Sequence, residues 1–117
     1  MKELLAKKTQ VLSKARALDD LGMPETAQPL WHEAAMLEER LAPWMDSLGR
    51  EAEGTLHRIS AGSCYRKAGR PGHAANLLQA ALAGQLSDQA RHDVEEMLDQ
   101  CLATYRETAA TVSTDPT

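Results

Sequence analysis

Two short segments with the same pattern place the strongest constraint on the fold of this chain. Gly22-Met-Pro24 and Gly69-Arg-Pro71 each place a glycine two residues before a proline. Glycine adopts the left-handed backbone conformation without steric cost, so it commonly follows the last residue of a helix. Proline suits the first residue of a helix, because its missing N–H would have no helical partner there. Each segment therefore predicts a tight turn between two helices.

The residues around the two turns match as well. Each turn is preceded by a small residue and then a leucine or tyrosine, and is followed by Ala, a large apolar residue and Ala. The matched pairs are Ala15 with Gly62, Leu18 with Tyr65, Ala27 with Ala74, Trp31 with Leu78, and Ala34 with Ala81. Small residues let two helix axes approach closely, and large ones fill the space beside the crossing. The pattern predicts two helical hairpins.

This arrangement resembles the tetratricopeptide repeat over about residues 8–84. The copies stand 47 residues apart, however, whereas the family period is about 34, so the extra residues either lengthen the helices or form a loop. Lys14 occupies a usually apolar position, and no proline follows Ala81. The resemblance implies a peptide-binding groove lined by the first helix of each hairpin. Ser60 and Ser63 stand where the family uses asparagines to grip a peptide carboxylate, so that specific recognition is not expected.

Apolar residues at every third or fourth position predict an all-α fold of five helices. The expected ranges are 2–21, 24–42, about 50–68 and 71–83, followed by a capping helix that begins after Ser87. Gly22, Gly69 and Gly84 should lie just outside helix ends. Residues 1–105 are expected to form one domain, and the tail 106–117, rich in Thr, Ala and Ser, is expected to be disordered.

Two prolines complicate the second helix. Pro29 predicts either a kink near Gln28 or a helix whose regular part begins later, because proline removes a backbone hydrogen bond. Pro43 should close or kink the same helix. Residues 43–50 remain open between a loop and a helix.

The sequence contains no catalytic or metal-binding pattern. Cys64 and Cys101 fit no metal spacing, and they are expected to be reduced, buried thiols. The pairs Glu53–His57 and His92–Glu96 have the spacing of surface interactions on a helix. The turn at Gly69 lacks the lysine and hydroxyl residue of a nucleotide loop. We therefore expect a protein that is not an enzyme and that uses no cofactor or metal.

The charge pattern bears on the partner. The net charge of −4 argues against nucleic acid, and no apolar stretch is long enough to span a membrane, so a cytoplasmic protein is expected. Residues 55–86 contain no Asp or Glu, whereas the stretch from Asp88 to Asp99 carries five acids. The two segments either neutralise one another or leave a basic surface for an anionic partner. The positively charged residues of the basic segment and its two histidines are Arg58, Arg66, Lys67, Arg70, His57 and His73.

The favoured function is that of a non-catalytic adaptor that binds a protein or peptide, an acidic one included. The resemblance places the binding residues beside the packing residues of the first helix in each hairpin. They are Leu12, Arg16, Asp19, Asp20, Ile59, Ser63, Arg66 and Lys67. The alternative is a self-assembling structural subunit, either a homo-oligomer or part of a larger complex, because two hairpins fall short of three repeats. Trp31 and Trp44 are the candidate contacts for such assembly, although Trp31 is better explained as an internal residue.

Overall fold

The computed structural model describes residues 1–113, and the side chains of residues 1–109. Five helices and their connecting turns account for these residues, which confirms the all-α fold class. The helices are α1 (Lys2–Asp20), α2 (Pro24–Ser47), α3 (Glu51–Lys67), α4 (Pro71–Leu82) and α5 (Asp88–Ser113).

Three glycines with a left-handed backbone join the first four helices. Gly22, Gly49 and Gly69 have φ angles of 74°, 75° and 76°. At each turn, the N–H of the residue after the glycine donates to the carbonyl five residues earlier, at 2.9 Å. This Schellman motif satisfies carbonyl groups that a helix end leaves without partners. The turns at Gly22 and Gly69 are confirmed; Gly84 lies two residues beyond α4, as expected, but the third left-handed turn uses Gly49.

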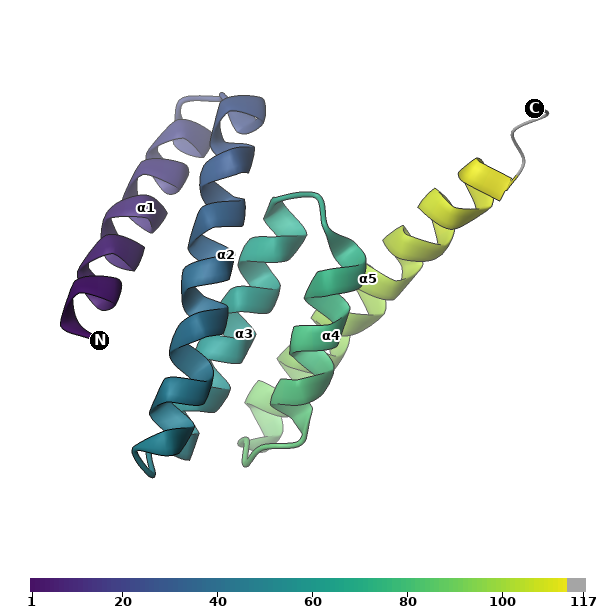
Figure 1. Cartoon of the computed structure of the whole chain (residues 1–117). Coiled ribbons are helices and arrows are strands. Elements are labelled where there is room, and N and C mark those ends of the chain that lie inside the picture. The colour runs from purple at the N-terminus through teal and green to yellow at the C-terminus, as the bar shows by residue number, and fades with distance from the viewer. Residues whose placement is uncertain (114–117) are drawn as a thin grey trace.

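Each helix packs mainly against its neighbours in the chain, as Figure 1 shows. The most extensive interface joins α2 to α3, and α5 lies against α4 with a small contact to α3. The later part of α5 continues past α4, away from the other helices. The resulting molecule has principal dimensions of 51 × 32 × 26 Å.

Helices α3 and α4 approach each other closely at Gly62. A Cβ atom added at Gly62 would stand 2.7 Å from both Cγ and Cδ2 of Leu78, closer than such atoms approach in proteins. Leu78, Ala74 and Ala81 are completely buried, and Tyr65 is almost completely buried. The small residues predicted at this crossing therefore allow the close approach.

Helix α2 is longer than expected. It continues through Pro43 to Ser47, so the prediction that it ends at residue 42 is wrong, and residues 43–47 are helical. Ala42 and Met45 are buried on either side of Pro43, whereas Pro43 itself is exposed. Apolar burial offsets the backbone hydrogen bond that proline removes.

Helix α5 begins directly after Ser87, where the capping helix was predicted to start. The backbone N–H of Ala90 donates to Ser87 Oγ at 3.1 Å, as expected of an N-cap. The guanidinium of Arg91, in the first turn of α5, donates to the carbonyl oxygens of Leu82 and Gly84, at 3.2 and 3.4 Å, and so satisfies the end of α4.

The helix also extends past the boundary predicted at residue 105. The described chain remains helical through Ser113, beyond the expected start of the tail at residue 106; residues 114–117 lie outside the described part. The hydroxyl groups of Thr104 and Thr108 each donate to the carbonyl four residues earlier, at 3.0 Å, and are thereby compatible with a helix.

Candidate partner-binding surface

The eight residues expected to bind a partner lie on α1 and α3. The structure divides them by exposure: Leu12, Asp19, Ile59 and Ser63 are half-buried, whereas Arg16, Asp20, Arg66 and Lys67 are exposed. The charged residues among the eight do not form one continuous binding surface, because Asp19 and Lys67 make specific contacts within the fold.

Trp31 connects residues of three helices. Its indole N–H donates to Asp19 Oδ2 at 2.8 Å, and the Lys67 ammonium lies 4.3 Å from the centre of its ring. Only 3% of Trp31 is exposed, so Trp31 is an internal residue. Its side chain contacts both charged groups from the inside of the fold. A cation that contacts a tryptophan ring while itself remaining exposed to solvent contributes about 0.5–1 kcal/mol. The Lys67 side chain therefore lies against the Trp31 ring while the residue remains exposed to solvent.

Charged residues of three helices act on the thiol of Cys64. Burial, together with the carboxylate of Glu38, raises the pKa of Cys64 to about 11, while Lys67, Arg16 and Lys8 act in the opposite direction. The cations that act on this thiol therefore come from both α1 and α3. Cys64 is buried and unbridged, and its raised pKa leaves it protonated near neutral pH. The thiol is unsuited to act as a nucleophile.

Glu38 is the charged residue that the sequence reading missed. Only 1% of it is exposed, on the inner side of α2. Lys8 Nζ lies 3.1 Å from Glu38 Oε1, although the angle does not make a hydrogen bond, and His57 Nδ1 lies 3.3 Å from Oε2. The available signal was the position of Glu38 between Leu37 and Leu41, within the apolar stripe of the helix.

Arg66 and Lys67 face different surroundings although they are adjacent in the chain. Burial raises the pKa of Cys101, and the charge of Arg66 opposes this rise, which places Arg66 near α5. Lys67 instead lies over Trp31 of α2. Arg66 and Lys67 are therefore associated with different helices, α5 and α2.

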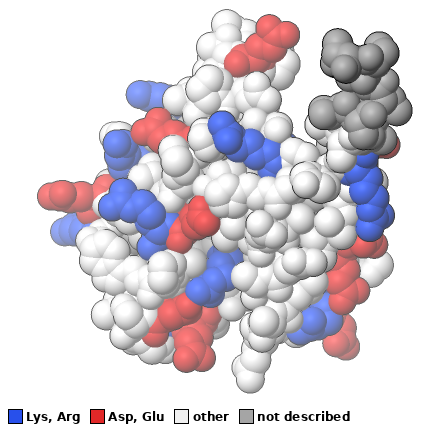
Figure 2. All heavy atoms as spheres, turned by 45° about the vertical axis from the view of Figure 1, so that its right-hand side comes forward, with Lys and Arg blue, Asp and Glu red and all other residues white. Residues whose placement is uncertain are grey.

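The acids that pair with the basic segment come from α2. Arg58 forms an ion pair with Asp46, and His73 Nε2 lies 3.1 Å from Glu39. Within the described part of the chain, no ion pair joins the acids between Asp88 and Asp99 to this segment, so the expected neutralisation of the two segments is not observed for those acids. Figure 2 shows acidic and basic side chains interspersed on the face that it presents.

A second polar cluster joins α2, α3 and α4. The Tyr65 hydroxyl donates to Glu39 Oε1 at 2.5 Å, and the His73 ring stacks on Tyr65 with 3.8 Å between ring centres. Burial and the bond to Glu39 raise the pKa of Tyr65, so the phenol keeps its proton. His32 lies 5.9 Å from the same ring, and burial together with Arg70 and His73 lowers its pKa. The cluster holds helices together and offers no charged tyrosine for catalysis.

No group of three or more His, Cys, Asp or Glu side chains in the described chain is placed to hold a metal ion. None of the described helices combines the length and apolar character needed to cross a membrane. Comparisons of the chain with family models, with curated proteins and with solved structures gave no match.

Proposed function

We propose that this chain is a non-catalytic adaptor of tetratricopeptide-like hairpins that binds an acidic protein or peptide segment. The binding surface is the basic rim, which we define as Arg16 of α1 and Lys67 of α3. The observation that carries the proposal is that Arg16 and Lys67 are both exposed without an ion-pair partner among the described residues, and both lower the pKa of the buried Cys64 thiol.

The charges around the rim favour an anionic partner. Arg16 and Lys67 are exposed, and neither has a carboxylate within ion-pair distance among the described residues. Lys8 differs, because it is half-buried beside Glu38. Two unpaired cations on a surface attract anionic partners, although salt weakens this attraction within about 10 Å at 0.1 M.

A direct test uses a fluorescent helical peptide of Glu, Ala and Leu and an equally long peptide with Gln in place of Glu. We expect the acidic peptide to bind more tightly, and its affinity to fall as salt is raised. The combined substitution Arg16→Ser and Lys67→Ser should remove both effects. The single substitution Arg66→Ser should have a smaller effect, because Arg66 lies toward α5.

The matched control combines Lys2→Ser with Arg106→Ser, which also removes two exposed cations. Lys2 lies 14 residues before Arg16 on α1, or about 21 Å at 1.5 Å per residue. The control variant should keep the affinity of the original chain. Equal losses in the two variants would show an effect of net charge alone and would contradict a site at the rim.

A second function, self-assembly, is favoured by one specific observation. Trp44 remains 41% exposed although it is one of only two tryptophans in the chain. Trp44 lines a hollow between the start of α1 and the second half of α2.

A further inference from the structure

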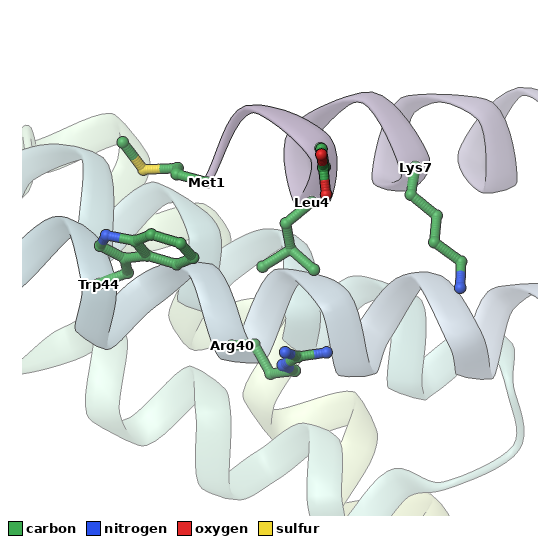
Figure 3. A pocket seen from close by; sticks show the side chains of 6 residues that line it. Met1, Leu4, Lys7, Arg40 and Trp44 are labelled. Carbon is green, nitrogen blue, oxygen red and sulfur yellow. The ribbon is translucent and has the colours of Figure 1, made fainter.

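A hollow of about 320 Å³ opens between the start of α1 and the second half of α2. Figure 3 shows Leu4 and Lys7 reaching into it from α1, and Arg40 and Trp44 from α2. The complete lining consists of Met1, Glu3, Leu4, Lys7, Arg40 and Trp44.

The apolar part of this surface extends beyond the hollow. Trp44 is 41% exposed, and Leu48, four residues later and directly after the end of α2, is 50% exposed. Residues four apart share one face of a helix. Among the described residues, the only extensive contact of α1 is with α2, and Trp44 and Leu48 remain exposed beside it. Tryptophan, arginine and methionine are enriched in the cores of protein interfaces.

The hollow also holds an unpaired charge of each sign. Arg40 is exposed on α2 and Glu3 is exposed on α1, and neither has an ion-pair partner among the described residues. Lys7 differs, because its ammonium lies 3.6 Å from Glu33. The surface therefore presents both members of an ion pair beside an exposed indole.

We propose that two copies of this chain associate through the hollow about a two-fold axis. In such an interface, residue i of one copy meets residue j of the other, and j meets i. Arg40 of each copy then faces the partner's Glu3, and both ion pairs form together while the two indoles cover the apolar lining. A second copy fits better than a foreign partner of one charge, because this surface is complementary to itself. The association goes beyond the proposed peptide binding and does not use the basic rim.

The first experiment measures molecular mass by sedimentation over a wide range of protein concentration. We expect the original chain to pass from monomer to dimer as concentration rises. Trp44→Ser should raise the dissociation constant by at least about 30-fold, the effect of losing an interface hot spot. Leu56→Ser is the matched control, because Leu56 is 60% exposed on α3 and does not line the hollow. A chain that stays monomeric, or a control as damaging as Trp44→Ser, would overturn the proposal.

The second experiment exchanges the charges. Arg40→Glu alone places two acids opposite each other, and Glu3→Arg alone places two cations opposite each other, so each variant should be monomeric. An equimolar mixture should form a heterodimer, because both pairs across the axis are then of opposite charge. Circular dichroism should give the same helix content for all variants, since both positions are exposed. A mixture that remains monomeric would refute the arrangement, because it would show that Arg40 and Glu3 do not meet across a two-fold axis.

Discussion

Trp31 of α2 donates a 2.8 Å hydrogen bond from its indole N–H to the carboxylate of Asp19 near the end of α1. This bond gives Asp19 a role within the fold, although the sequence reading placed it among the partner-binding residues. The neighbouring Asp20 has no such partner and remains exposed. Of these two adjacent acids in one helix, Asp19 therefore stabilises the fold through Trp31 and Asp20 does not.

Asp19→Ala should lower the free energy of unfolding by about 1–3 kcal/mol, because a nearly buried indole N–H loses its charged acceptor. Asp20→Ala removes the same charge one residue later and should change stability by less than about 0.5 kcal/mol. Urea unfolding of both variants measures the difference. Equal losses would mean that Asp19 acts through its charge and not through Trp31.

Local signals in the sequence were sufficient for most of the fold. Gly22 and Gly69 each need only their own backbone conformation and a following proline to predict a turn. Gly62 and Ala74 were likewise placed at the crossing of α3 and α4, where the structure leaves no room for larger side chains. Such features depend on residues near each other in the chain.

The features that the sequence did not predict depend on contacts between distant segments. Helix α2 continues past Pro43 because buried residues on both sides pack against the rest of the fold. The guanidinium of Arg91 lies at the end of α4 because the carbonyl oxygens of Leu82 and Gly84 need hydrogen-bond donors. Glu38 is buried because Lys8 and His57 meet it from two other helices.

The candidate binding surface was predicted only in part for the same reason. Periodicity identifies the exposed face of a helix but does not say which charged residues have partners within the fold. Asp19 has such a partner, and Arg66 lies near α5, whereas Arg16 and Lys67 remain for the basic rim.

Gly62→Ala should destabilise the crossing of α3 and α4. The new methyl group would lie 2.7 Å from Leu78 Cγ, and overpacking of this kind costs about 1–3 kcal/mol. The higher helix propensity of alanine returns up to about 1 kcal/mol. Combining Gly62→Ala with Leu78→Ala tests the cause, because removal of the clashing atoms should make the double variant more stable than the sum of the single effects predicts. If the losses of unfolding free energy in the two single variants simply add in the double variant, the clash with Leu78 is not the cause of the destabilisation.

His32 should make stability fall in mildly acidic solution. Burial and then the charges of Arg70 and His73 lower the pKa of His32 below its ordinary value of 6.5. The unfolded chain therefore binds more protons at this position than the folded chain, so stability increases with pH in this range. The contribution of His32 to the free energy of unfolding is fully present above about pH 6.5 and decreases as the pH falls below 6.5.

Two measurements check this prediction. An NMR titration of the His32 ring should have its midpoint below 6.5, and His32→Asn should reduce the dependence of unfolding free energy on pH between about 5 and 7. A His32 midpoint at or above 6.5 would contradict the sign of the effect.

Cys64 should react slowly with thiol reagents in the folded protein. Burial raises the pKa of Cys64 from an ordinary value of 9.0 to about 11, which reduces the thiolate fraction near neutral pH by about 100-fold. A Cys101→Ala variant leaves Cys64 as the only thiol, so its alkylation can be followed by mass spectrometry. We expect slow labelling in buffer and rapid labelling in denaturant; rapid labelling in buffer would contradict a buried thiol.

The same thiol can report on the basic rim. Because Lys67 and Arg16 both lower the pKa of Cys64, replacing either with Ser in the Cys101→Ala background should raise this pKa further. The pH dependence of alkylation should therefore move to higher pH in both variants. Lys2→Ser serves as the control, since Lys2 is not among the charges that act on Cys64. An unchanged profile in the Arg16 and Lys67 variants would show that these cations do not converge at Cys64, and would remove the main support for the proposed binding surface.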